Sequence, residues 1–273
     1  MEIRSILLGM SLSTISPSLV AIGADLAQRF NADLTGFAAA DVSIEPIVAE
    51  WTAALSARYE EERRRIEQAL EDGESIFAKG ITGSLEHTWR SLITQPTPIL
   101  IESARRHDLI VLGAASVADR RPGMGIDAGE LILAAGRPVL IAAQGASRVA
   151  ADKVVVAWKD TREARRAISD ALPFLKGAAD ILVATVQEGD YGTERESLKD
   201  VVSWLNAHEI KARSDILPLA GTVGATLKTA AAAMGADLIV SGGYGHMRLR
   251  EWLFGGATID LLDDQTISHL FSN

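Results

Sequence analysis

The chain has no cysteine among its 273 residues, so disulfides, thiolate nucleophiles and cysteine-ligated zinc or iron sites are excluded. It also lacks an excess of basic residues, because the formal net charge is −9 and the pI is near 5.1. Nucleic-acid binding requires clustered Lys and Arg to neutralise phosphates, so this charge argues against it. No apolar run approaches the roughly 18 residues of a membrane span, and the first residues lack the layout of a signal peptide. We expect a soluble cytoplasmic protein with no nucleic-acid or membrane partner.

Groups that carry chemistry are also scarce. The five histidines show no metal-ligand spacing, and we expect them at the surface or at helix ends: His87, His107, His208, His246 and His269. Neither a G-x-S-x-G elbow nor a G-x4-G-K-(S/T) phosphate loop occurs. No sequence motif identifies a general base or an acidic residue that would bind Mg²⁺. We therefore assign no catalytic residue and no metal site.

What the chain does contain is an internal repeat. Asp108–Gly113 reads DLIVLG and Asp237–Gly242 reads DLIVSG, and each follows an Ala-rich helical stretch. Arg4–Met10 and Asp152–Trp158 each open a half as an apolar strand followed by a polar turn. The length suits two domains of roughly 130 residues. We predict two tandem domains, residues 1–147 and 151–273, joined by a short polar link.

In each half, apolar strand-like runs alternate with segments of helical period, which is typical of a parallel sheet with helical crossovers. The fold class is therefore α/β, with two five-stranded parallel sheets and helices on both faces. The expected strands are Ile3–Met10, Asp33–Ala39, Leu85–Thr94, Leu109–Gly113, Pro138–Ala142, Lys153–Trp158, Asp180–Val186, Lys211–Leu217, Leu238–Gly242 and Ile267–Ser272. The expected helices are Pro17–Phe30, Pro46–Lys79, Thr97–His107, Ala128–Ala135, Thr161–Leu175, Glu194–His208, Thr222–Met234 and Thr258–Asp263.

The long helix expected from Pro46 to Lys79 makes the first half the longer one. It carries Glu60 four residues before Arg64, a spacing that supports an exposed charged face. Such a face is either simply solvated or adds a contact in a homodimer, and the sequence leaves both readings open.

A glycine-rich loop follows the second DLIV strand and precedes a short helix. Gly242, Gly245 and Gly255 let the backbone approach a ligand closely, and a helix N-terminus beside them favours a phosphate. Arg248 and Arg250 lie inside the loop and could close over an anion, and His246 could donate to one. The alternative is a tight surface loop that only requires glycine torsions.

The spacing of these glycines resembles that of a known family. The stretch GGYGHMRLREWLFGGAT matches the pattern G-x2-G-x9-G-(S/T) up to its last position. The chain resembles the universal stress protein family in its tandem two-domain form. The resemblance implies a Rossmann-like fold of the adenine nucleotide alpha hydrolase type. It also implies that the last strands of the two halves meet across a pseudo-twofold interface. For function, it implies a stress-response protein that binds ATP or a related nucleotide in its second domain as a regulatory signal, with slow hydrolysis at most.

The resemblance implies a nucleotide site made of three loops, in which backbone glycines hold phosphates and Val186 lies near adenine. The implied residues are Ala157, Lys159, Asp160, Val186, Gly242, Gly245, Gly255, Gly256, Ala257 and Thr258. Two positions depart from the family. Gly256 stands where a hydroxyl residue is usual, with Thr258 as the nearest substitute. Lys159 stands where the family has an acid, so either Asp160 replaces that acid or Lys159 meets a phosphate.

The first half lacks this pattern. Ser116 stands at the second glycine position, Ile126 stands at the third, and Met10–Ser13 contains no acid. We interpret this half as structural or partner-binding. For the protein as a whole, two further hypotheses compete with nucleotide binding. One is a nucleotide-free tandem interaction module, and the other is a binder of a different phosphorylated or acidic small molecule.

Overall fold

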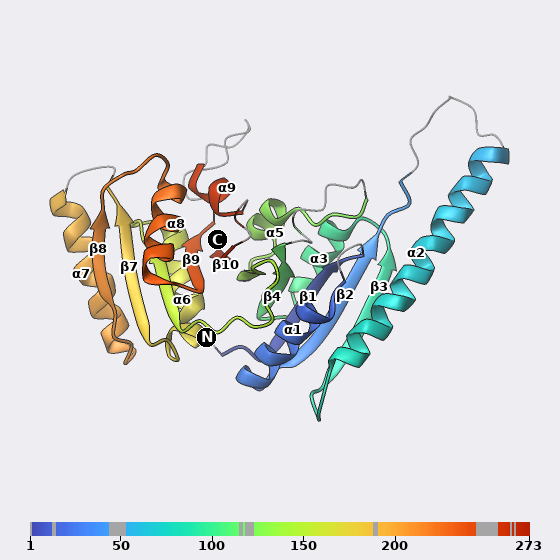
Figure 1. Cartoon of the computed structure of the whole chain (residues 1–273), viewed down its shortest axis with the longest axis horizontal. Coiled ribbons are helices and arrows are strands. Elements are labelled where there is room, and N and C mark those ends of the chain that lie inside the picture. Colours follow the sequence, from blue (N-terminus) through green and yellow to red (C-terminus); the bar gives the residue numbers. More distant parts are fainter. Residues whose placement is uncertain are drawn as a thin grey trace. The chain divides into compact units, whose positions relative to one another are not determined.

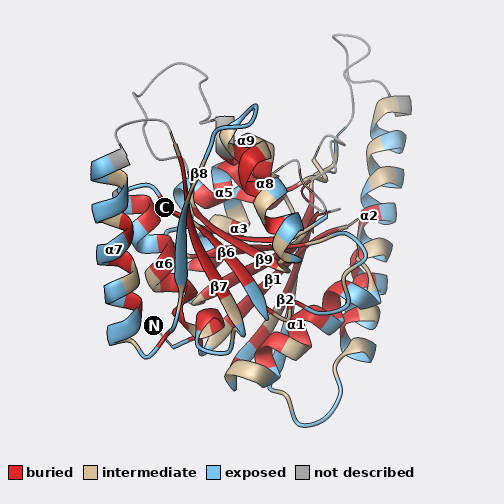
Figure 2. Ribbon diagram, turned by 60° about the vertical axis from the view of Figure 1, so that its left-hand side comes forward, coloured by how far each residue is buried: buried red, intermediate tan, exposed pale blue. Residues whose placement is uncertain are grey.

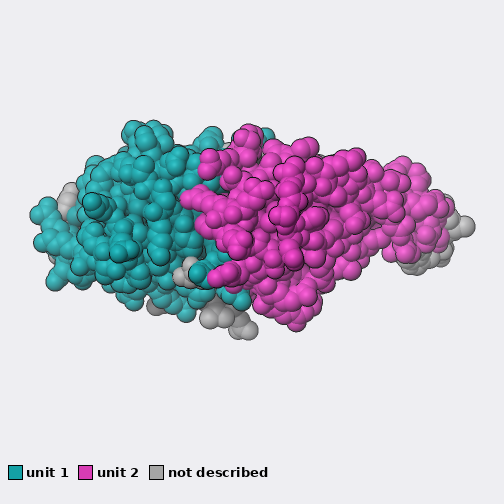
Figure 3. Space-filling view, turned by 90° about the horizontal axis from the view of Figure 1, so that it is seen from below, with its two compact units in different colours: residues 1–3, 136–144, 149–273 teal, residues 4–135, 145–148 magenta. Residues whose placement is uncertain are grey.

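The computed structural model describes residues 2–12, 15–43, 53–114, 117, 123–187, 191–243, 256–262, 264 and 266–273. The chain forms two compact units, which are coloured separately in Figure 3. Unit 2 consists of residues 4–135 and 145–148, and unit 1 consists of residues 1–3, 136–144 and 149–273. The predicted boundary between residues 147 and 151 stays a prediction.

Unit 2 contains a parallel sheet with the strand order β3-β2-β1-β4 (Figure 1). Helix α1 contacts α2, and α3 contacts α5, so the helices form two pairs. Its described elements are β1 (Ser5–Ser11), α1 (Pro17–Phe30), β2 (Asp33–Ala40), α2 (Ala53–Gly80), β3 (His87–Ile93), α3 (Pro96–Ala104), β4 (Leu109–Gly113) and α5 (Ala128–Ala134).

Unit 1 contains the strand order β5-β10-β9-β6-β7-β8, in which neighbours from β10 to β8 run parallel. Its described elements are β5 (Val139–Ala142), β6 (Lys153–Ala157), α6 (Arg162–Leu175), β7 (Asp180–Val186), α7 (Tyr191–Ala207), β8 (Arg213–Leu217), α8 (Val223–Met234), β9 (Leu238–Gly242), α9 (Gly256–Leu262) and β10 (Ser268–Ser272).

The last strands of the two halves pair with each other. β5 runs antiparallel to β10, with Leu140 opposite Leu270 and Ile141 opposite His269. The predicted meeting of these strands is confirmed. Pairing covers a strand edge that would otherwise expose unsatisfied backbone groups.

The core of unit 1 lies along its central strands, which appear red in Figure 2. Val154 and Val155 in β6 and Ile239 and Val240 in β9 have no exposed surface. Continuous runs of aliphatic residues are typical of parallel strands that are covered on both faces. The α/β class with parallel strands and a repeated architecture is therefore confirmed.

Local chemistry determines where several helices begin and end. Ser16 caps α1 by accepting from the Leu19 N–H at 3.3 Å, and Pro17 follows at the first helical position. Gly235 ends α8 in the left-handed region, as its position after the Ala-rich run predicts. The largest differences between predicted and observed helix ends are three residues, at the end of α3 and at the start of α7. The predicted start of the long helix at Pro46 lies outside the described residues.

The expected placement of His269 was wrong. This residue lies inside β10 and is 1% exposed, because the strand is covered on both faces. His107 follows α3, as expected for a helix-end residue, but it is also buried and its Nδ1 lies 2.9 Å from the Ser103 carbonyl oxygen.

Candidate functional site

The largest gathering of predicted site residues lies in unit 1, at the carboxyl ends of β6, β7 and β9. A cavity of about 660 Å³ opens there. Open parallel sheets bind ligands at this edge. The predicted residues that line it are Ala157, Lys159, Asp160, Val186, Gly242 and Thr258. The structure thus brings together six of the ten residues, taken from four separate segments of the chain.

The other predicted residues belong to the glycine loop or its end. Gly256 and Ala257 begin α9, directly before the buried Thr258. Gly245 and Gly255 lie outside the described residues, as do Arg248, Arg250 and His246.

Trp158 forms a fixed wall of the cavity and is 8% exposed. Its backbone N–H donates to the Ala184 carbonyl at 2.8 Å, and its carbonyl accepts from the Thr185 hydroxyl at 2.9 Å. Its indole Nε1 donates to the Ser197 hydroxyl at 2.9 Å, which ties the loop after β6 to helix α7. A tryptophan held by two bonds of its backbone and one of its indole presents a rigid aromatic surface to a ligand.

The two candidates for the acidic position differ in their surroundings. Asp160 accepts from the Nε of Arg165 at 3.0 Å, so its carboxylate already has a cationic partner. Lys159 is exposed and lines the cavity. A ligand hydroxyl would compete with Arg165 for Asp160. Among the described lining residues, Lys159 is the one with a cationic side chain, so a ligand anion would meet its charge there.

Gly242 is required by packing within unit 1. A Cβ added there would lie 2.8 Å from the Ala164 nitrogen and 2.8 Å from the Glu163 carbonyl carbon. Both atoms belong to the backbone of the first turn of α6 and cannot swing away like the end of a side chain. The glycine lets the end of β9 lie directly against the start of α6. The absence of a side chain at Gly242 is therefore required by the packing of β9 against α6, whether or not a ligand also binds there.

Glu163 is a buried carboxylate in the same first turn, 7% exposed, and it lines the cavity. Burial raises the pKa of its carboxyl. Hydrogen bonds from Arg162, from its own backbone N–H and from Thr161 outweigh burial and hold the pKa below its ordinary value. Glu163 is therefore ionised at neutral pH and is already paired with Arg162.

Ser241 is a lining residue that sequence reasoning missed. It is 6% exposed, and within the described part of the chain its Oγ has no hydrogen-bond partner. A buried hydroxyl without a partner costs about 1–3 kcal/mol unless a ligand or water supplies the bond. The signal was present in the repeat, because DLIVSG carries Ser241 where DLIVLG carries Leu112.

Helix α9 follows the glycine loop and is fixed to α8 by its Asp260. The carboxylate accepts from the Thr222 hydroxyl, and its backbone carbonyl accepts from Lys228 Nζ at 3.1 Å. Thr222 Oγ1 also accepts from the Ala225 N–H at 3.1 Å and so caps α8. One hydroxyl thus caps a helix and positions the neighbouring helix.

We expect Thr222→Ala to lower the free energy of unfolding by about 1–2 kcal/mol, because it removes both the cap and the bond to Asp260. Thr222→Ser keeps the hydroxyl and should stay within about 0.5 kcal/mol of the wild type. Urea unfolding of both variants measures the difference. Equal losses in the two variants would contradict a contribution from the hydroxyl.

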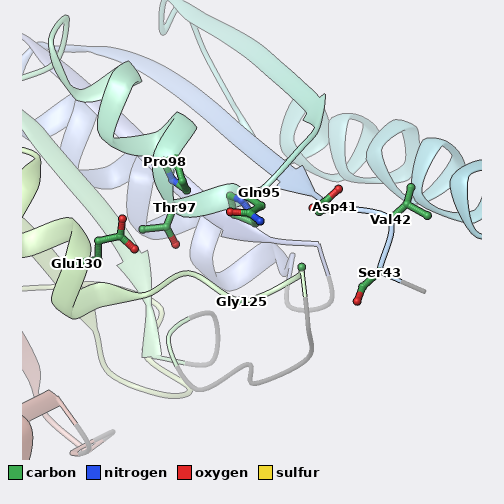
Figure 4. Close-up of a pocket in the computed structure, with 10 residues that line it drawn as sticks. Asp41, Val42, Ser43, Gln95, Thr97, Pro98, Gly125 and Glu130 are labelled. Carbon is green, nitrogen blue, oxygen red and sulfur yellow. The ribbon is translucent and has the colours of Figure 1, made fainter. Parts of the chain in front are cut away.

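Unit 2 contains a different cavity of about 560 Å³ near the ends of β2 and β3 (Figure 4). Asp41 follows β2, Gln95 and Thr97 lie at the start of α3, and Glu130 lies in α5. Gly123 lies against the Asp41 backbone, where the Asp41 N–H donates to the Gly123 carbonyl at 2.8 Å. The described lining carries two carboxylates and no Lys or Arg. These walls do not suit a phosphate.

Among the described residues, no cluster of His, Cys, Asp or Glu could hold a metal ion. Within the same part of the chain, no helix is long and apolar enough to cross a membrane.

Comparison with known proteins gives the fold. No family model matches the chain, and no curated protein matches it either. A universal stress protein from Archaeoglobus fulgidus DSM 4304 matches 100% of this chain and 99% of its own, with a TM-score of 0.71 and 15% identity. A protein of unknown function from Pseudomonas aeruginosa PAO1 matches 99% and 92%, with a TM-score of 0.55 and 15% identity. The chain is thus similar, along its whole length, to a universal stress protein with two copies of the domain, and it has the tandem universal stress protein fold.

Proposed function

We propose that this chain is a universal stress protein whose second half binds ATP or a related adenine nucleotide as a regulatory signal. The observation that carries the proposal is the cavity at the ends of β6, β7 and β9, which gathers six of the residues that the family resemblance implied. Its volume of about 660 Å³ falls within the usual range for small-molecule sites.

The cavity has one apolar region and one polar opening. Trp158, Val186 and Leu261 supply apolar surface that suits the flat face of a base. Ser241 offers a hydroxyl to a polar group of the ligand. On this proposal the glycines from Gly242 to Gly256 would hold phosphates through backbone N–H groups, with Lys159 as the nearby cation.

Regulation by binding fits these residues better than catalysis. A general base needs a carboxylate that is available to accept a proton. Asp160 is held by Arg165 and Glu163 is held by Arg162. Neither of these two carboxylates is placed to activate water, and no motif assigns that role to Glu194, the third carboxylate of the lining, so we expect slow hydrolysis at most.

The first test is to denature freshly purified protein and identify released small molecules by mass spectrometry, followed by calorimetric titration with ATP, AMP and cAMP. We expect nucleotide binding, weakened about tenfold in Lys159→Ala, because one charge-assisted contact of about 1.4 kcal/mol is lost. Lys199→Ala on α7 is the matched control, since Lys199 is exposed and does not line the cavity.

Other outcomes lead to the alternative functions. Release of another phosphorylated or acidic molecule that still depends on Lys159 would keep the site and change its ligand. Failure of every nucleotide and phosphate ester at millimolar concentration would rule out the nucleotide proposal. The nucleotide-free interaction module would then be the leading interpretation.

A further inference from the structure

A second hollow in unit 1 lies between α6 and α7, on the far side of Trp158 from the candidate nucleotide site. Its volume is about 740 Å³, and we name it the α6–α7 groove. Ile168 and Val201 are its aliphatic lining residues, and Trp158 and Trp204 are its aromatic ones. Ser197 lines both hollows, as do Trp158, Asp160 and Thr193, and it accepts the Trp158 indole N–H at 2.9 Å, so the two hollows share part of their walls.

The corresponding helix pair in unit 2 leaves less room. There, α2 places glycines against the segment that begins α1. A Cβ at Gly80 would lie 2.6 Å from Val20 Cγ1, and one at Gly73 would lie 2.5 Å from Ile15 Cδ1. The two copies therefore use the same helix positions differently. The first copy packs them closely, and the second leaves a groove.

Trp204 supplies an apolar anchor within this groove. It is 36% exposed, although tryptophan is the residue that gains most from burial at an interface. His208 packs against one edge of its ring, with the ring centroids 4.4 Å apart. A tryptophan that lies beside buried Ile168 and Val201 extends their apolar surface to solvent.

The charges around the groove are acidic on the α7 side. Glu196, Asp200 and Trp204 follow one another at i, i+4 and i+8, so they form one row on the helix. Both carboxylates are exposed and line the groove, whereas the basic residues of this helix segment, Arg195 and Lys199, do not line it.

The α6 side supplies little compensating charge. Arg165 also lines the groove, but its guanidinium is already bound to Asp160, with Nε at 3.0 Å from the carboxylate. The described lining thus has three carboxylates, of which Asp160 is bound to Arg165, and the other two, Glu196 and Asp200, lie next to an apolar anchor. This combination attracts a cationic segment and lets it bury an apolar side chain.

We propose that the α6–α7 groove docks a segment of a partner protein in which a Lys or Arg stands next to an aromatic or long aliphatic side chain. The cation pairs with Glu196 and Asp200, and the apolar side chain packs on Trp204 and Val201. The proposal holds whichever ligand the neighbouring cavity binds.

The test uses the full chain, immobilised, and a phage-displayed library of short random peptides, with counter-selection against Trp204→Ala. We expect the selected peptides to be enriched in Lys or Arg beside an aromatic or aliphatic residue. Fluorescence anisotropy of the best labelled peptide then measures affinity. Trp204→Ala should weaken binding at least about tenfold, and Trp204→Phe should restore most of it, because loss of a buried aromatic anchor typically has this effect.

Charge reversal provides the matched comparison. The pair Glu196→Lys and Asp200→Lys should weaken binding at least about tenfold at low salt, and less at high salt. The pair Glu71→Lys and Glu74→Lys changes the net charge equally on the exposed face of α2, and should change binding less than about twofold.

Three results would overturn the proposal. Selection could yield no peptide that depends on Trp204, or peptides without basic residues. The α2 reversal could weaken binding as much as the groove reversal, which would leave only a general charge effect. Sedimentation could instead show a dimer that Trp204→Ala dissociates, and the groove would then be a contact between two copies of this chain.

Discussion

Gly242→Ala is expected to lower the free energy of unfolding by about 2–3 kcal/mol, because the new methyl group must displace backbone and not a flexible side chain. Its Cβ would lie 2.8 Å from the Ala164 nitrogen and 2.9 Å from Glu163 Cβ, so the first turn of α6 has to move away from β9. Reduced freedom of the unfolded chain opposes this loss by only about 0.4–1 kcal/mol. Because Ala164 and Glu163 also line the cavity, the shift should weaken ligand binding as well.

The repeat supplies a matched control for this substitution. Gly113 ends β4 as Gly242 ends β9, but a Cβ there would meet only the Leu19 side chain, with the nearest atom at 3.3 Å. A leucine end can shift by a few tenths of an ångström at small cost, so Gly113→Ala should lose less than about 1 kcal/mol. Urea unfolding of the two variants gives the comparison. Equal losses would mean that the contact with α6 does not explain why residue 242 is glycine.

Much of this fold could be predicted from sequence because its signals are local and repeated. Four aliphatic or small residues bounded by Asp and Gly predict a buried parallel strand in both halves, and Leu109–Gly113 and Leu238–Gly242 confirm it. Helix ends also have local signals, as Pro17 and Gly235 illustrate. The pairing of β5 with β10 came from the family resemblance, since periodicity alone does not say which strands are neighbours.

The site could be predicted only where it follows strand ends. Ala157, Val186 and Gly242 end their strands, so any parallel arrangement brings them to one edge. Thr222 and Ser197 also line the cavity, but they lie on helices whose rotation depends on tertiary packing. The Arg165 contact that engages Asp160 depends on side-chain conformation, which no spacing rule supplies. Ser241 is the exception, because the difference between the two repeats marked it.

His269 makes unit 1 sensitive to mild acid. Burial in β10 lowers the pKa of its imidazole to about 4, and Lys228 also lowers it, while the Asp264 charge and a hydrogen bond with the Ile267 backbone act in the opposite direction. Its Nε2 has no partner within the described residues. The folded state therefore favours the neutral ring, whereas the unfolded chain takes up the proton near the ordinary pKa of 6.5.

The contribution of His269 to the free energy of unfolding is fully present above pH 6.5, the pKa of its imidazole in the unfolded chain. It is lost as the pH falls toward about 4, the pKa in the folded protein. Between about pH 7.5 and about pH 5, the wild type should lose about 2 kcal/mol through His269 alone, and about 3 kcal/mol once the pH is below the folded value. His269→Leu should remove this loss. At neutral pH it should cost about 1–2 kcal/mol, because the hydrogen bond between the ring and the Ile267 backbone is lost, whereas the other ring nitrogen has no partner to lose.

Urea unfolding at the two pH values measures the effect as a difference between the variant and the wild type, so that acid effects from the carboxylates, which both proteins share, cancel. His87→Gln is the control, since His87 is exposed on the edge strand β3 and its substitution should leave the wild-type dependence in place. A His269→Leu variant that loses as much stability as the wild type between about pH 7.5 and about pH 5 would contradict the argument. The imidazole would then have to be hydrated in the folded protein, and the β5–β10 pair would not be the dry interior that its 1% exposure indicates.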